Sequence, residues 1–459
     1  MKHTLLIIGL GFIMLPVTAQ TSLAGKGAES ETSDSRIEFV KTANTPDLKE
    51  ILKKDREKEN NNVEVPHFAI RTRDNKFALT IGGQISTIIG GDLGNDLYQN
   101  DNAGISFVTS QIPVPPQVGK KSDFYINPLR ANVDFQVVGF GGTDNQVTGY
   151  IKIGTNGVNN LLKLKKAYLS WRGITVGQKN TLFQDNAASQ PPTIDPQGPS
   201  GMVSATAYEL SYITPSFSGF RAALGIDMPS YYSSDGVYRG KDFKSWNNMD
   251  IAGLPVADPN AYNQNVPDIP LWIEYAKSDF NRIRFSALIR NFSYKNLMDQ
   301  KHHHSVGWGM MLSGNYNPVE PLIFYATAAY GKGIGAYIQD LQGIPLSFIP
   351  DNTHPGKMTP TPMMGVTLGV TYNISPKWQI NAMASEARIW KVAPYAEAAA
   401  TDPGNYNDYR YGFYTAGNVF YNISSYLQVG VEYLYGHRKT WNNGSASDSR
   451  VQMQIAFTL

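Results

Sequence analysis

The sequence predicts an all-β fold, a 16-stranded antiparallel transmembrane β-barrel that follows a short N-terminal helical extension. Two patterns carry this prediction. Apolar and polar residues alternate along many segments, and the links between those segments are short and long in turn. A third observation, an apolar stretch at the N-terminus, indicates export from the cytoplasm.

The composition excludes several classes of protein. The 459 residues include 26 Tyr, 20 Phe and 7 Trp, an aromatic content of 12% that is too high for a disordered chain. There is no Cys, so neither a disulfide framework nor a cysteine-based metal site is expected, and no cofactor is predicted. The formal net charge of +2 gives no reason to expect nucleic acid as a partner.

Residues 1–19 are predicted to be a cleaved signal peptide. Lys2 and His3 precede an apolar run from Leu5 to Leu15, and small residues lead to a cleavage site after Ala19. The alternative is an uncleaved anchor helix, but the run is shorter than the ~20 residues that span a bilayer.

Residues 20–66 are predicted to form a periplasmic leader with one short helix. Thr45 is a suitable N-cap, and Pro46 suits the first helical position. The helix has one narrow apolar stripe, made of Leu48, Ile51 and Leu52. This stripe favours a helix that packs on a surface, and a coiled coil that joins subunits is the alternative.

Residues 67–459 are predicted to form the barrel, and the final segment shows the pattern best. Its apolar residues are Val451, Met453, Ile455, Phe457 and Leu459, and the residues between them are polar or small. Successive side chains of a strand point to opposite faces, so one face of this strand is apolar. The alternation recurs in segments 283–289, 306–312, 322–330, 366–372 and 427–435.

The links between the segments favour a barrel over a soluble secreted β-protein, which is the alternative. Short links such as 278–281 alternate with long links such as 184–204 and 331–361. One end of the sheet therefore carries tight turns and the other carries long loops, as in up-and-down transmembrane barrels. The strands are expected to begin near residues 76, 122, 145, 161, 173, 204, 218, 267, 281, 304, 320, 363, 377, 406, 425 and 449.

Several motifs resemble the DcaP-like porins and the related phosphate-selective porins of Gram-negative outer membranes. The similar segments follow the family's order and are 77–83 (FALTIGG), 161–171 (LLKLKKAYLSW), 173–178 (GITVGQ), 181–185 (TLFQD) and 196–201 (PQGPSG). The resemblance covers roughly residues 67–459. It implies a 16-stranded barrel that assembles as a homotrimer, with the basic strand 161–171 near the narrowest part of the pore. Unlike many members, which end in Phe, this chain ends in Phe457-Thr458-Leu459.

Residues that alternate with the lipid-facing ones are expected to line the pore. The predicted basic pore-lining residues are Arg130, Lys152, Lys163, Lys165, Arg221, Arg282, Arg284 and Arg290. The predicted acidic ones are Asp134, Glu209, Glu274 and Glu432. An excess of basic residues of about two to one favours anions, and a solvated lining without selectivity is the alternative. Lys166 breaks the alternation, so a subunit interface or a local bulge is expected there.

Residues 185–201 are predicted to fold inward as a constriction loop. The segment is rich in Pro and small polar residues, and Pro191, Pro192 and Pro199 would fix its turns. Asp185 and Asp195 are its candidate functional residues. An ordinary extracellular loop is the alternative.

The sequence contains no motif that predicts catalysis or a metal site. The run His302-His303-His304 falls in a predicted short external loop, and three consecutive histidines rarely bind one ion together. Neither a Gly-x-Ser-x-Gly elbow nor a His-Glu-x-x-His motif occurs. The chain is therefore not expected to be an enzyme.

These expectations combine into an outer-membrane porin of Gram-negative bacteria. Small hydrophilic solutes would diffuse through a water-filled channel, with a mild preference for anions. The expected partners are outer-membrane lipid, other copies of the chain in a homotrimer and the solutes themselves. The alternative keeps the barrel but assigns the activity to its long loops, as in an adhesin or a lipid-acting enzyme.

Overall fold

The computed structural model describes residues 37–58, 65–74, 76–96, 106–115, 120–121, 124–128, 131–155, 162–229, 266–295, 301–342, 344, 346–350, 357–390, 409–441 and 443–459. The predicted signal peptide, the first part of the leader and Arg130 lie outside these described residues.

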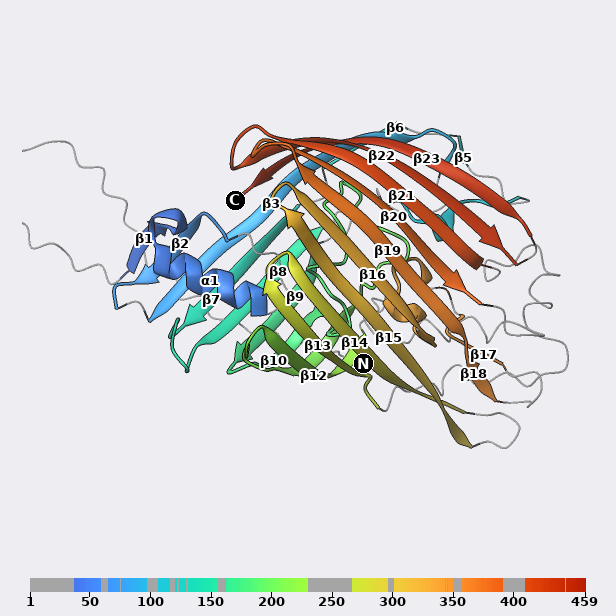
Figure 1. Ribbon diagram of the computed structural model, residues 1–459, viewed down its shortest axis with the longest axis horizontal. Helices are drawn as coiled ribbons and strands as arrows, with labels where there is room; N and C mark the ends of the chain where they lie inside the picture. The colour runs from blue at the N-terminus through green and yellow to red at the C-terminus, as the bar shows by residue number, and fades with distance from the viewer. Residues whose placement is uncertain are drawn as a thin grey trace, which may run out of the picture. The chain divides into compact units, whose positions relative to one another are not determined.

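One antiparallel sheet closes on itself to form a barrel (Figure 1). Each strand pairs with the next along the chain, and the last pairs with the first, from Arg450↔Asp92 to Thr458↔Gln84. Sixteen strands, the second of them broken, form the ring: β3 (Phe77–Asp92), β6 (Phe124–Asn127) with β7 (Asn132–Gly139), β8 (Val147–Thr155), β9 (Leu162–Trp171), β10 (Ile174–Asn180), β11 (Thr206–Ile213), β12 (Phe220–Pro229), β13 (Ile269–Ser278), β14 (Asn281–Lys295), β15 (His302–Val319), β16 (Leu322–Lys332), β19 (Pro362–Asn373), β20 (Trp378–Ile389), β21 (Tyr409–Asn422), β22 (Leu427–Thr440) and β23 (Ser445–Thr458). The predicted fold class is confirmed, and every predicted strand start lies within four residues of the observed one.

Two short strand pairs lie outside the ring, in the long links. β4 (Asn95–Asp96) pairs with β5 (Lys120–Lys121), and β17 (Phe348–Pro350) pairs with β18 (Met358–Pro360).

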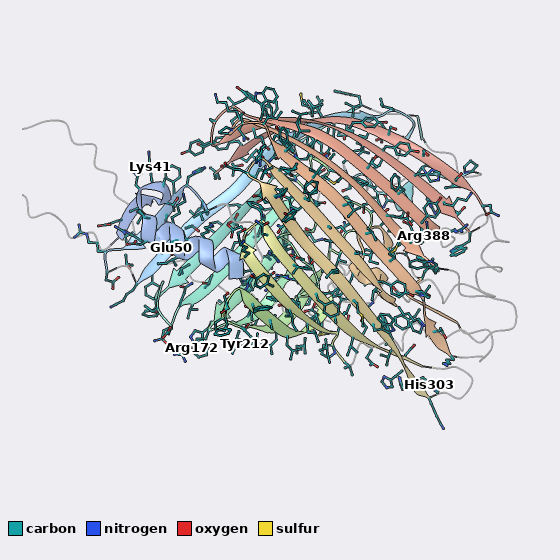
Figure 2. The ribbon with its side chains drawn as sticks, in the orientation of Figure 1. Lys41, Glu50, Arg172, Tyr212, His303 and Arg388 are labelled. Carbon is teal, nitrogen blue, oxygen red and sulfur yellow. The ribbon has the colours of Figure 1, made fainter. Side chains whose placement is uncertain are left out.

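The outer face of the barrel is apolar and exposed, and its side chains project from the strands in Figure 2. On β23, Val451, Ile455 and Phe457 are 42–44% exposed. The alternate residues Gln452 and Gln454 are 1% and 4% exposed, because they face the interior. A soluble monomer rarely exposes an apolar surface that continues around the whole molecule, so lipid covers this face and the barrel spans a membrane.

The second strand of the ring is broken after Pro128. β7 pairs with the first half of β3, and β6 pairs with the second half. Proline has no backbone N–H with which to continue the ladder, so the break falls where the sequence cannot maintain pairing.

A bulge on β9 explains why Lys166 breaks the alternation. Lys152 of β8 pairs with Lys166, but the next residue, Ile153, pairs with Leu164, so the register shifts by one residue at Lys165. Past the shift, Lys166 shares a face with Tyr168, which is 5% exposed and points inward. The expectation of a local bulge is thus confirmed.

A small N-terminal module precedes the barrel and consists of β1 (Ile37–Lys41), η1 (Thr42–Asn44), α1 (Pro46–Lys58) and β2 (Phe68–Thr72). β2 pairs with both β1 and the start of β3, so the module extends the barrel sheet at the short-turn end. This addition was not predicted. α1 begins at Pro46, as predicted, and its apolar stripe is buried: Leu48 and Leu52 are 8% and 0% exposed. Within the described part of the chain, no helix is long and apolar enough to cross a membrane.

Candidate functional site: the interior of the barrel

Three segments of the long links fold into the barrel. They are 106–115, which contains η2 (Thr109–Gln111), 181–205, and the described residues of 333–348, which contain η4 (Gly335–Tyr337) and η5 (Gln339–Leu341). Most of their side chains are buried. The sequence predicted an inward fold for part of the second segment only.

An ion-pair cluster on β13, β14 and β15 holds the beginning of segment 181–205. Asp185 accepts hydrogen bonds from Arg282 Nη2 at 2.9 Å and from Ser313 Oγ at 2.7 Å. Burial alone would raise the pKa of Asp185, but the guanidinium groups of Arg284 and then Arg282 lower it below its usual value. The carboxylate beside them, Glu274, pairs with three arginines: Arg221, Arg282 and Arg284.

Glu432 on β22 holds the middle of the same segment. Its carboxylate accepts five hydrogen bonds, from Thr193 Oγ1 (2.6 Å), Ile194 N (3.0 Å), Asp195 N (2.9 Å), Asn418 Nδ2 (2.7 Å) and Gln452 Nε2 (2.8 Å). The side chain is 1% exposed. A buried carboxylate with this many donors fixes the path of the segment, because each donor would be left unsatisfied if the segment moved away.

Gly201 lets the end of the segment approach the wall. Its N–H donates to Ser385 Oγ at 2.8 Å. A Cβ at Gly201 would lie 2.6 Å from the backbone nitrogen of Val366, closer than any real side chain approaches. Only glycine therefore permits this contact between the segment and strands β19 and β20.

The three inward segments are bonded to one another through two loop carboxylates. Asp195 accepts the N–H of Phe107 at 3.0 Å, and Asp340 accepts the N–H of Ser110 at 3.1 Å and the hydroxyl of Thr109. Burial is the main reason that the pKa of Asp195 rises to about 7 and that of Asp340 to about 6. The negative charge of Glu432 raises the pKa of Asp195 further, whereas the hydrogen bond from the N–H of Phe107 lowers it.

An apolar cluster fills part of the interior, although the residues that alternate with the lipid-facing ones were expected to line the pore. It joins segments 181–205 and 333–348 to inward residues of β14, β15 and β19, and includes Phe183, Leu288, Met311, Ile334, Tyr337, Ile338, Phe348 and Met363, all at most 1% exposed. The reason is that the inward segments cover these strand positions, which therefore pack against protein and not against water.

The lysines predicted to line the pore lie on the opposite side of the ring from this cluster. Lys152 is on β8, and Lys163 and Lys165 are on β9. All three side chains are half-buried, whereas Arg284 and Arg290 on β14 are 0% and 3% exposed. Solvent therefore reaches the inner wall along β8 and β9 while it is excluded from much of β14.

The remaining predicted residues occupy buried positions. Asp134 and Glu209 are 6% and 3% exposed, and Lys179 Nζ lies 3.5 Å from Glu209. Arg290 pairs with Asp268 at 2.9 Å. Several buried acids inside the barrel were not predicted from the sequence: Asp92, Asp227, Asp268, Asp340 and Asp448. Among the described residues, these acids offset part of the expected excess of basic residues.

The three consecutive histidines were predicted to lie in an external loop, but they belong to a strand. His302, His303 and His304 are the first residues of β15 and pair with Lys295, Tyr294 and Ser293 of β14. Figure 2 shows His303 at the end of the barrel opposite to Glu50 and Arg172. Among the described residues, no group of three or more His, Asp or Glu side chains is placed to hold a metal ion.

Comparison with known proteins supports the fold. No family model and no curated protein sequence matches the chain. Among solved structures, the outer membrane channel DcaP of Acinetobacter baumannii has a TM-score of 0.65 and 16% identity, over 85% of this chain and 99% of that chain. OmpF of Salmonella typhi has a TM-score of 0.50 and 9% identity, over 84% and 99%. The resemblance to DcaP-like porins is thus confirmed for the fold.

Proposed function

We propose that this chain is an outer-membrane porin, a water-filled channel for the passive diffusion of small hydrophilic solutes with a mild preference for anions. The observation that carries the proposal is the placement of segment 181–205. It is fixed along one side of a closed membrane barrel, opposite a wall whose lysines keep contact with solvent. The similarity to a solved outer membrane channel supports the same function.

The anion preference follows from which charges are accessible to solvent. On the side of β13 and β14, Arg282 and Arg284 are paired with Asp185 and Glu274 and are almost inaccessible to solvent. The lysines of β8 and β9 face the space that remains. A passing ion therefore meets a basic surface on that side, which lowers the barrier for anions and raises it for cations.

Three further features belong to the same proposal. Residues 1–19 act as a cleaved signal peptide, the barrel resides in the outer membrane of a Gram-negative bacterium, and three copies assemble into a homotrimer. Selectivity comes from pore size and lining charge, so the function requires neither a catalytic residue nor a cofactor.

Single-channel recording in a planar bilayer tests the proposal. Purified, folded protein should produce discrete conductance steps, and the reversal potential in a salt gradient should indicate a modest preference for anions. A silent bilayer would refute the channel, and a cation-selective current would refute the assigned lining.

A further inference from the structure

The N-terminal module, residues 37–58 and 65–72, contacts the short-turn end of the barrel at widely separated places in the ring. Ile51 packs on Gly141 in the turn between β7 and β8, and Lys53 Nζ lies 3.2 Å from Asp279 Oδ2 in the turn between β13 and β14. These turns are six strands apart in the ring. Because residues 51 and 53 are only two positions apart on one helix and point to different sides of it, the two turns lie close together across the mouth, and α1 lies between them.

A third contact comes from the other end of the module. The ring of His67 lies 4.3 Å from that of Tyr426, in the turn between β21 and β22. β2 meanwhile pairs with β3. The module is therefore attached on several sides of the opening and cannot lie on the outer rim alone.

The helix docks on the inner side of the wall. Leu48 and Leu52 pack against Ala78 of β3 and Val138 of β7. Ala78 and Val138 are 7% and 2% exposed, whereas their lipid-facing neighbours Phe77 and Val137 are 46% and 44% exposed. A helix that packs on the inward face at the end of a barrel occupies part of the opening through which solutes would pass.

The two attachments of the helix differ in strength. Leu52 is 0% exposed, so its release from the barrel would require the loss of a buried apolar contact. The side chains of Lys53 and Asp279 are 44% and 53% exposed, and an exposed ion pair of this kind is weak and sensitive to salt.

We infer that α1 is a lid over the short-turn mouth of the channel, with the buried contacts of Leu48 and Leu52 as its anchor and the Lys53–Asp279 ion pair, at a different part of the ring, as its releasable latch. Release lets the helix tilt about this anchor, away from the turn between β13 and β14, and enlarges the conducting cross-section. The inference rests on the proposed channel function and adds a gate to it.

Charge reversal tests the latch. Lys53→Glu and Asp279→Lys should each increase the time spent in a higher-conductance state, by about 1.5- to 5-fold or more, since an exposed pair contributes in that range. The double variant K53E/D279K should restore the wild-type distribution. Lys76→Glu is the matched control, because Lys76 also forms an exposed ion pair at this end, with Asp74 3.3 Å away, but within its own turn.

A reversible disulfide tests the anchor of the helix independently. A Cβ at Gly141 would lie 3.2 Å from Cγ2 of Ile51, and the φ of Gly141 is not positive, so the pair I51C/G141C suits a disulfide. The chain has no native Cys to compete. The bond joins the helix to the side of the barrel that already anchors it, so the oxidised variant should keep the higher-conductance state, and Lys53→Glu should still increase the time spent in that state. Loss of the higher-conductance state on oxidation would contradict the assigned anchor.

Salt provides a third readout. The Debye length falls from about 10 Å at 0.1 M to about 3 Å at 1 M salt. Wild-type conductance, divided by the conductivity of the solution, should therefore rise with salt, whereas that of Lys53→Glu should not. Conducting channels whose states ignore both the charge reversals and the salt concentration would overturn the lid and leave the porin intact. A silent wild-type protein that runs as folded would overturn both.

Discussion

Glu432 accepts the backbone N–H of Asp195 at 2.9 Å, and this contact ties a loop from the fifth link of the barrel to its fifteenth strand. The side chain of Asp195 in turn accepts the N–H of Phe107 and the hydroxyl of Tyr414, at 3.0 and 3.2 Å. The carboxylate of Glu432 on the wall and that of Asp195 on the loop therefore hold the loop in place, and the position of the loop determines the width of the channel on this side.

Replacing Glu432 with Ala should release the middle of segment 181–205. The buried N–H groups of Ile194 and Asp195 would lose their acceptor, at a cost of about 1–3 kcal/mol each. Hydrogen–deuterium exchange in the peptide around residues 193–197 should accelerate, and single-channel currents should become noisier. Glu320→Ala is the matched control, because Glu320 is exposed in the turn between β15 and β16. Unchanged exchange in the Glu432 variant would show that the segment is held elsewhere.

The docking of this segment should weaken as the pH rises. The pKa of Asp195 is about 7 in the folded protein against 3.8 as its ordinary value, so the folded state binds the proton more tightly. The contribution to stability is fully present below about pH 4 and is lost as the pH rises through 7, a difference on the order of 4 kcal/mol. Above pH 7 the charged Asp195 faces Glu432, with Arg450 the nearby positive charge.

Exchange of the peptide around residues 193–197, corrected for the intrinsic pH dependence, should therefore be faster at pH 8 than at pH 5. Asp195→Asn removes the titrating group and should abolish the difference. A persistent difference in that variant would assign the effect to another group, with Asp340 the next candidate because its pKa is about 6.

Reversing the charge of Lys163 and Lys165 should move ion selectivity toward cations. At about 8 Å and an effective dielectric constant near 40, each unit charge changes the energy of a monovalent ion by about 1 kcal/mol. The reversal potential of K163E/K165E in a salt gradient measures the change. Lys377→Glu, in an exposed turn, should leave the potential unaltered. If the double variant keeps the wild-type potential, these lysines do not line the narrow part of the pore.

Arg450→Met should destabilise the seam between the last and first strands. Arg450 Nη2 lies 3.0 Å from Asp92 Oδ2, and the two side chains are 0% and 2% exposed. Removal of one partner leaves a buried charge without its counter-charge, which destabilises the folded protein by about 3–5 kcal/mol. The temperature at which the folded band disappears in a gel-shift assay should fall, and R450M/D92N should recover most of the loss. Equal stability of wild type and the single variant would contradict the role of the pair.

The sequence predicted the wall of the barrel well because each strand reports its own environment. In residues 451–459 the period-two pattern alone assigns Val451 to lipid and Gln452 to the interior, and no distant residue can alter that assignment. The bulge at Lys165 could be expected for the same reason, since Lys166 breaks a local pattern.

The filling of the barrel could not be predicted in this way. Leu288 and Met311 alternate with lipid-facing residues, but their partners come from segments 181–205 and 333–348. Those segments have no periodicity, and some of their contacts join residues more than two hundred positions apart, as for Asp195 and Glu432. The N-terminal β1–β2 pair was missed because each strand has only five residues.

Because of the apolar cluster inside the barrel, the width of the channel does not depend on the number of strands alone. In a hollow barrel, the number of strands determines the bore. Here the cross-section is shared with a compact globular core built from link residues, so trimming or enlarging a link would alter the size limit for solutes while the strand count, the lipid-facing girth and the seam stayed constant. Changes in the links can therefore alter which solutes pass through the channel without changing the surface of the barrel that contacts lipid.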